Sequence, residues 1–441
     1  MISRKAGLTT LAALAVASSL SCAAKTNGGA TGGGFVPIDK NRPGDALFAD
    51  ALAHFNLGVS AQSAGFTERK LGNGATATTD FQTAQTEFTT AQGLFDQLKN
   101  DAALCGPTPT SIRCDAAGYY GGRCSYELGL ASDELAALTG AASTAVTSFQ
   151  DAVTRLDAMK AAYPGSWMID QASYFDGRAR FHLAQAKVVG FTWADARAQF
   201  QASLAANAAG TYADNSQYYV GRCWFEDGLA LVNVPVRPLP GSPDYVAATA
   251  DFQNAEVELK KVLSSYPGST YVVNARYYLG KTFYERPFDP AALAGRIADL
   301  GTAIGWFDQV IAANGLFVGG AHYWRGRCHY ALAFDLVTPP APPDVTELGN
   351  ALLDLKAVPA TDVYADNALY FDVKSYMNLH VATATDATGS YCTAVRTPDA
   401  PPASACAANT ALKTLYPASP YVAKAASYIS TFPTVTACVC P

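Results

Sequence analysis

A six-residue cluster recurs along the chain and constrains its fold more than any other feature. Each copy begins with Tyr followed by a second aromatic residue, and its fifth residue is Arg or Lys. Five copies have Gly directly before this cation, and the sixth has Val373 there. The copies start at Tyr119, Tyr174, Tyr218, Tyr277, Tyr323 and Tyr370, and a degenerate copy precedes them at 55–58. Such repetition predicts one structural unit that is stacked many times.

The stretches between the clusters are amphipathic. Phe149, Val153 and Leu156 show the spacing of three and four residues that places apolar side chains on one face of a helix. Tyr-Pro followed two residues later by Ser ends three of these stretches, at 163–166, 266–269 and 416–419. Because proline stops a helix and serine can cap the next one, each unit is predicted to be two helices. Helix A carries the cluster, and helix B carries the amphipathic stretch.

This pattern resembles the tetratricopeptide repeat (TPR), in which helix A has aromatic and small residues at fixed spacing and helix B ends near a proline. The resemblance covers residues 45–430. It implies an all-α, TPR-like α-solenoid of about seven helix pairs plus a closing C-terminal helix, with one continuous core. The units here are longer than the family's because of insertions between helices A and B, at 234–244, 338–344 and 385–405. These rim loops are either binding elements or tolerated insertions.

One face of helix A is predicted to line a groove. Positions six and three residues before the repeat glycine and one residue after it share a helix face, which lines the concave groove in the TPR family. The predicted groove for an envelope protein or peptide consists of Tyr174, Arg178, Asn215, Tyr218, Arg222, Asn274, Tyr277, Tyr323, Arg327, Asn367, Tyr370 and Lys374. Arg178, Arg327 and Lys374 are favoured as ligand contacts, because they lack the Glu that follows the other cations by four residues. The alternative is that this set of residues is a packing requirement of the fold.

The N-terminal residues are predicted to be a targeting segment. Residues 1–21 have the basic start, short apolar run and small residues of an export signal. The segment 19–22 resembles the lipobox of bacterial lipoproteins, which implies lipidation at Cys22; the alternative is ordinary signal cleavage. Residues 22–44 would then be the lipidated cysteine and a Gly-rich tether, and 431–441 a Cys-containing tail.

An exported chain meets an oxidising compartment, so its cysteines are candidates for disulfides. Cys105 and Cys114 bracket a short turn, and Cys392 and Cys406 bracket the last long loop. Each pair is predicted to form a local disulfide. Three further cysteines share one position of helix A and are predicted to be buried, reduced packing residues: Cys124, Cys223 and Cys328.

Composition and the absence of known motifs argue against several functions for this chain. With 49% hydrophobic and 15% charged residues the chain is a folded protein, and a net charge of -6 excludes non-specific nucleic-acid binding. The five histidines show no ligand pairing, and the sequence has no Cys-x-x-Cys, P-loop, dinucleotide fingerprint or G-x-S-x-G. We therefore expect no metal, no cofactor and no enzymatic activity.

Signal, lipobox and repeats together resemble the periplasmic TPR lipoproteins of Gram-negative outer membranes, such as the scaffold lipoprotein of the β-barrel assembly machinery and the coordinator of the Tol–Pal system. The resemblance implies a non-enzymatic scaffold that is lipid-anchored to the outer membrane on its periplasmic face and docks an envelope protein or peptide. The alternative is a surface lipoprotein of the SusD type, which also uses a TPR scaffold and binds glycans or nutrients through Trp and Tyr side chains.

Overall fold

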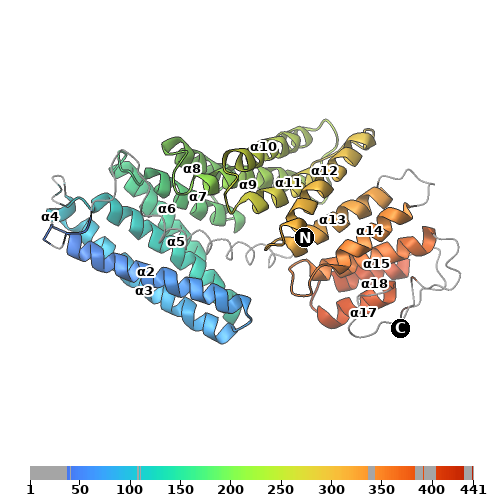
Figure 1. Ribbon diagram of the computed structural model, residues 1–441, viewed down its shortest axis with the longest axis horizontal. Helices are drawn as coiled ribbons and strands as arrows, with labels where there is room; N and C mark the ends of the chain where they lie inside the picture. Colours follow the sequence, from blue (N-terminus) through green and yellow to red (C-terminus); the bar gives the residue numbers. More distant parts are fainter. Residues whose placement is uncertain are drawn as a thin grey trace. The chain divides into compact units, whose positions relative to one another are not determined.

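The computed structural model describes residues 37–39, 41–106, 109, 111–335, 343–382, 391, 404–431 and 440. In this part of the chain, seven A/B helix pairs follow one another and a final helix closes the series (Figure 1). The A helices are α2 (Asp45–Lys70), α5 (Cys114–Thr139), α7 (Ile169–Gln185), α9 (Ala213–Val232), α11 (Val272–Glu285), α13 (Val318–Tyr330) and α15 (Ala365–Ala382). The B helices are α3 (Gly74–Asn100), α6 (Ala145–Ala162), α8 (Trp193–Ala206), α10 (Pro243–Ser265), α12 (Leu293–Ala312), α14 (Val345–Lys356) and α17 (Ala405–Leu415). The closing helix is α18 (Tyr421–Thr431), and two short elements are α4 (Ala102–Cys105) and the π-helical turn η1 (Ala331–Asp335).

The chain is therefore an all-α, TPR-like helical repeat protein, which confirms the predicted fold class. Its described residues divide into two compact units, one up to residue 227 and one from residue 228 onward, and the division falls within α9. In the first unit, the long helices α2, α3, α5, α6, α7 and α8 each pack against the next one in this order. The short α4 contacts α3. In the second, α10 to α18 do the same, and α15 contacts both α17 and α18. The continuity of the core between the units stays a prediction.

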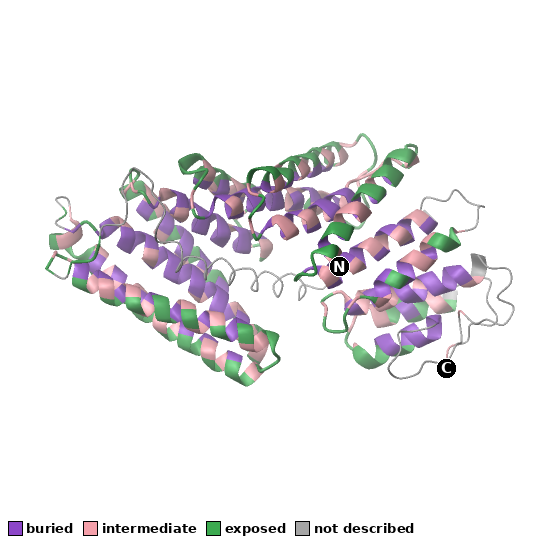
Figure 2. Ribbon diagram, viewed as in Figure 1, coloured by how far each residue is buried: buried purple, intermediate pink, exposed green. Residues whose placement is uncertain are grey.

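Each helix contributes one apolar stripe to the core. In α3, Phe81, Phe88 and Phe95 recur every seventh residue, and all three side chains are 0% exposed. This spacing returns to nearly the same side of a helix, so one face is buried while the opposite face stays polar. Figure 2 shows this division along α2 and α3, where buried residues face the neighbouring helix and exposed residues face outward.

The repeat glycine lies where helix A crosses its own helix B. A Cβ atom on Gly280 of α11 would lie 2.6 Å from Cε1 of Phe307 in α12, closer than carbon atoms can approach. Gly177 meets Phe200 and Gly58 meets Phe88 in the same way, at 2.9 and 2.8 Å. The glycine therefore lets the two helix backbones approach closely while a large ring fills the space between them.

Gly280→Ala is expected to lower the free energy of unfolding by about 1–3 kcal/mol, because the added methyl group must displace the Phe307 ring. Gly301→Ala in α12 is the matched control: its side is open to solvent, with nothing within 4 Å of the added Cβ. The control should raise the same free energy by about 0.5–1 kcal/mol, since alanine favours the helix. Urea denaturation followed by circular dichroism measures both, and a shift of the same sign for both substitutions would contradict the close approach.

The predicted stop signals end helices as expected. Tyr163, Tyr266 and Tyr416 directly follow the last residues of α6, α10 and α17. The serine three residues later accepts a hydrogen bond from the backbone N–H two residues further on, for example 3.0 Å from Tyr271 to Ser269. The serine thus closes the turn before the next helix instead of capping the first turn of that helix.

Several predicted segments lie wholly or mainly outside the described residues. They are the signal 1–21 with Cys22, most of the tether 22–44, the insertions 338–344 and 385–405, and the tail 431–441. The insertion 234–244 is described, and it connects helix A (α9) to helix B (α10) as predicted.

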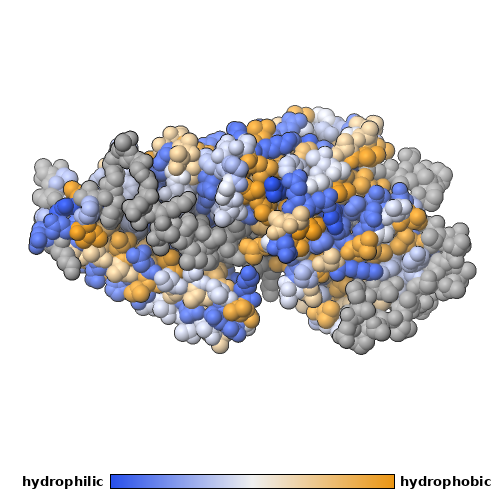
Figure 3. Space-filling model, in the orientation of Figure 1, coloured by the Kyte–Doolittle hydropathy of each residue, from blue (hydrophilic) through white to orange (hydrophobic). Residues whose placement is uncertain are grey.

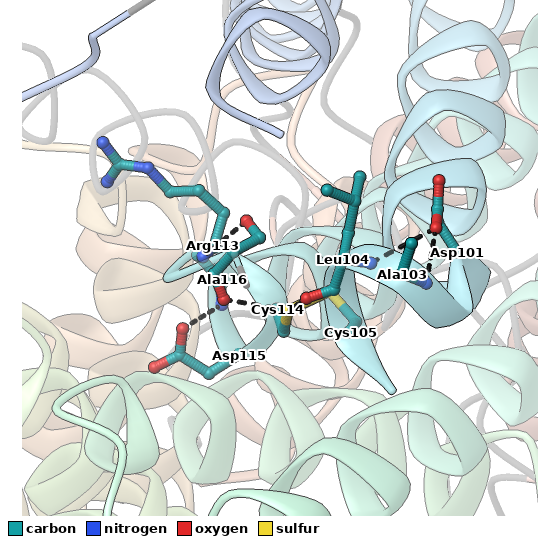
Figure 4. Close-up of a disulfide and its surroundings, with 9 residues drawn as sticks. Asp101, Ala103, Leu104, Cys105, Arg113, Cys114, Asp115 and Ala116 are labelled. Carbon is teal, nitrogen blue, oxygen red and sulfur yellow. Dashed lines mark hydrogen bonds between the residues drawn. A yellow bond between two sulfur atoms is a disulfide. The ribbon is translucent and has the colours of Figure 1, made fainter. Parts of the chain in front are cut away.

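The cysteines confirm one predicted pair and correct the other. Cys105 and Cys114 form a disulfide, with their Cα atoms 5.5 Å apart, next to the Asp101 side chain that caps α4 (Figure 4). Cys406 is bonded to Cys440, not to Cys392 as predicted, and Cys392 lies outside the described residues. The prediction was wrong because it paired cysteines that bracket one loop, whereas the fold places Cys440 beside Cys406 of α17. As predicted, Cys124, Cys223 and Cys328 are free, buried thiols, and burial raises the pKa of each.

Candidate functional site

The residues predicted to line the groove bond to one another. In α7, Nη1 of Arg178 donates a hydrogen bond of 2.8 Å to the hydroxyl oxygen of Tyr174, one helical turn earlier. Nδ2 of Asn215, on the next A helix, donates a bond of 3.2 Å to the same oxygen. One phenol therefore joins a cation of its own repeat to an amide of the following repeat.

The second unit repeats this arrangement. Nη1 of Arg327 and Nδ2 of Asn367 both donate to the hydroxyl oxygen of Tyr323, at 2.8 and 2.6 Å. The bond within the helix also forms in α9, where Arg222 donates to Tyr218 at 3.1 Å. We call this recurring set of Tyr, cation and following Asn the ladder.

Aromatic rings of neighbouring repeats enclose the ladder cations. The guanidinium carbon of Arg178 lies 5.4 Å from the ring centre of Tyr126 on the preceding A helix and 4.6 Å from that of Tyr219 on the following one. Cations over ring faces are attracted by the ring quadrupole, most strongly when water is excluded. The matching ring pairs are Phe55 and Phe175 around Arg123, at 4.8 and 4.6 Å, and Tyr284 and Phe371 around Arg327, at 5.3 and 4.1 Å.

A second aromatic position supports the ladder and was missed by the sequence analysis. Tyr212 stacks on the ladder phenol Tyr174, with ring centres 4.5 Å apart and planes 7° apart. Tyr364 stacks on Tyr323 in the same way, at 4.6 Å and 6°. Tyr212 and Tyr364 each stand nine residues before the position of the repeat glycine in their own repeat. Phe317, which stacks on Tyr277, holds the same position in its repeat. This recurrence is visible in the sequence, and a comparison extended beyond the six-residue cluster would have found it.

The ladder is mostly interior. Eight of the twelve predicted groove residues are no more than 5% exposed: Tyr174, Arg178, Asn215, Tyr218, Arg222, Asn274, Tyr277 and Tyr323. Arg178, favoured as a ligand contact, is 1% exposed, which corrects that expectation. The helix face was identified correctly, but the adjacent repeats cover it. The structure therefore favours the packing interpretation for these eight residues.

Four predicted groove residues keep partial exposure. They are Arg327, Asn367, Tyr370 and Lys374 in the second unit. Lys374 lies over the Tyr330 ring, 4.5 Å from its centre, and over Tyr428 of α18 at 5.6 Å. Partner binding by these four residues stays a prediction; two of them, Arg327 and Asn367, already donate hydrogen bonds to Tyr323.

Buried charges beside the ladder are paired. Arg123 and Glu127 lie 3.6 Å apart, and Arg222 and Glu226 lie 2.8 Å apart, at the predicted spacing of four residues. Burial raises the pKa of the Glu127 carboxyl, and the nearby arginines oppose this rise. The buried cations are thus stabilised by three kinds of interaction: aromatic ring faces, hydrogen bonds to Tyr hydroxyls and ion pairs with carboxylates.

Three of the five tryptophans, Trp193, Trp224 and Trp324, pack against side chains of the fold. Trp193 contacts Phe181 edge-on at 4.8 Å, and Arg197 lies 3.4 Å from the centre of the Trp224 ring. Trp324 is buried, whereas Trp167 is 42% exposed. These positions give the glycan-binding alternative no aromatic platform of several exposed rings among the described residues.

No group of three or more His, Cys, Asp or Glu side chains in the described residues has the arrangement of a metal site. Across the same residues, every helix is too short or too polar to span a lipid bilayer.

Comparisons with known proteins add little. No protein-family model matches the chain. No curated protein matches it either. Among solved structures, the chain is similar to a monomeric mutant of IFIT1 with m7Gppp-AAAA, with 12% sequence identity and a TM-score of 0.38 over 87% of this chain and 79% of that chain. A likeness of this size assigns no function.

Proposed function

We propose that this protein is an exported lipoprotein, anchored by lipid at Cys22 to the periplasmic face of the outer membrane, and that it is a non-enzymatic scaffold for an envelope protein. The observation that carries the scaffold role is the stack of A/B helix pairs held together by the ladder. Helical repeats of this kind present helix faces and loops to other proteins, because each repeat needs only its neighbours for stability. Within the ladder, the Tyr, Arg and Asn side chains bond to one another and so join neighbouring repeats.

The location rests on the N-terminal sequence. A basic start, a short apolar run and the segment 19–22 support export and lipidation, and the glycines of 25–34 support a tether. The net charge of -6 opposes attachment to anionic lipid by surface charge, which supports a covalent anchor as the proposed mode of attachment.

The anchor is tested by Cys22→Ser in the full chain, expressed in a Gram-negative bacterium. The unchanged chain should sediment with the outer membrane, and the variant should move to another fraction, because it lacks the thiol that carries the lipid. Equal sedimentation of both forms would contradict the lipid anchor.

The scaffold role is tested by affinity isolation of the full chain from detergent-solubilised envelope. We expect one envelope protein in near-equimolar amount, identified by mass spectrometry. Recovery of no protein, together with saturable binding of an oligosaccharide, would contradict the scaffold role and favour the SusD-type alternative.

A further inference from the structure

The connection between α9 and α10 exposes apolar side chains on a proline-rich backbone. Val236 is 78% exposed, Leu239 is 73% exposed and Val234 is 43% exposed. Scattered apolar residues are normal on a protein surface, and Figure 3 shows them between hydrophilic residues on the visible face. Three within six residues of one connection form a local cluster, which is a feature of interaction sites.

The sequence fixes the backbone of this connection. Residues 234–240, here called the proline segment, contain Pro235, Pro238 and Pro240. Proline holds its own φ near −65° and pushes the preceding residue to extended conformations. Of the seven residues only Val236 is neither a proline nor directly before one. The prolines therefore restrict the segment and favour the polyproline II (PPII) conformation. In the structure the chain bends at 233–236, so uptake of the whole segment as PPII requires these residues to straighten.

Both ends of the proline segment are held by the fold. Helix α9 ends at Val232, and Gly241 with φ of 79° makes the turn into α10. The Ser242 side chain then accepts a bond of 3.3 Å from the backbone N–H of Tyr245 and caps α10. A short, stiff segment between two helices loses little entropy when a partner binds it.

Several polar groups of the proline segment remain accessible, although the carbonyl oxygen of Leu239 accepts a hydrogen bond of 3.0 Å from the N–H of Ser242. The backbone N–H groups of Val236 and Arg237 make no hydrogen bond to any described residue. The side chain of Arg237 is 54% exposed and lies 3.8 Å from Glu285, a weak ion pair that a partner carboxylate can replace.

We propose that the proline segment is the docking element for the scaffolded protein, and that a groove lined with Tyr or Trp rings on that protein takes it up in the PPII conformation. In PPII, side chains three residues apart share an edge, so Val236 and Leu239 form one apolar edge and Pro235 and Pro238 form another. Flat aromatic rings accept such edges, and a carboxylate beside the rings would pair with Arg237. This inference rests on the proposed scaffold function and names the chemistry of the partner.

A membrane surface fits this segment less well than a protein groove. Segments that insert into the lipid interface combine Trp or Phe with several cations. The proline segment has no aromatic residue and one cation, Arg237. Its valine, leucine and proline side chains can instead pack against the flat rings of an aromatic groove.

The test repeats the affinity isolation with Val236→Asp/Leu239→Asp in the full chain. Recovery of the envelope protein should fall at least about tenfold, as expected when central apolar contacts are lost. Val257→Asp is the matched control, because Val257 is 53% exposed on α10 outside the segment; it should leave recovery unchanged. Far-UV circular dichroism checks that both variants are folded.

A second measurement uses the unchanged chain and a synthetic peptide of residues 233–241. This peptide should displace the isolated protein, and the same peptide with all three prolines changed to Ala should need about tenfold more, because it is no longer preorganised. A photo-crosslinker at position 236 should join the chain to a surface containing Tyr or Trp.

The outcomes separate the two proposals. Unchanged recovery with Val236→Asp/Leu239→Asp, no displacement by the peptide, or a crosslink to lipid or to a second copy of this chain would each overturn the docking element while leaving the scaffold role intact. Isolation of no protein by the unchanged chain would overturn both.

Discussion

Arg178→Ala is expected to lower the free energy of unfolding by about 3–5 kcal/mol, as for other large side chains removed from a core together with a buried hydrogen bond. The guanidinium fills the space between Tyr126 and Tyr219 and bonds to Tyr174. The substitution removes those contacts and leaves the carboxyl of Glu127, which Arg178 helps to keep charged, with less compensation.

Chemical denaturation measures this loss, and hydrogen exchange in α7 localises it. Lys261→Ala is the control, because this lysine is half exposed and its one ion pair among the described residues is with Glu258, three residues earlier on α10. Its effect should stay within about 0.5 kcal/mol. A loss below about 1 kcal/mol for Arg178→Ala would mean that the cation is not part of the interior, and would restore the open-groove interpretation.

Acidification is expected to destabilise the protein through His182. This ring is 8% exposed and stacks on Phe149, with centres 4.6 Å apart and planes 9° apart. Burial, together with the positive charge of Arg178, lowers the pKa of His182 to about 3. Because the His182 side chain takes up a proton near pH 6.5 in the unfolded chain but not in the folded chain, its contribution to the free energy of unfolding falls as the pH falls from 6.5 to 3. The contribution is about 5 kcal/mol at the end of this range and roughly half of that at pH 4.5.

The variant His182→Phe isolates this contribution. The difference in free energy of unfolding between pH 7 and pH 4.5 should be about 2–3 kcal/mol smaller than in the unchanged protein. Any constant effect of the substitution cancels in this difference. So does the opposite contribution of Asp176, whose pKa burial raises to about 6 against the attraction of Lys160 and Arg180. Equal pH dependence in both proteins would show that His182 is not held neutral.

The repeat pattern was sufficient to predict the helices, their pairing and their order. The Tyr-Pro signals, the amphipathic spacing of α6 and the repeat glycine are local features, and each has a direct consequence for backbone or packing. The pairing of Cys105 with Cys114 was predictable for the same reason, since only nine positions separate them.

The partner of Cys406 and the exposure of Arg178 were not predictable in this way. Each depends on which distant segment comes to lie beside the residue. The sequence shows that Tyr174 and Arg178 share a helix face, yet an empty groove and a neighbouring repeat are equally compatible with that spacing. Asn215 and Tyr219, on the next A helix, are what fill the space.

The order of residues alone thus determined that this protein is a series of helix pairs, because the periods of its apolar and aromatic positions are properties of single helices. The tertiary structure alone decided that the ladder joins repeats and that Val236 and Leu239 stay outside, because burial is set by the distance between elements that the chain brings together only when it folds.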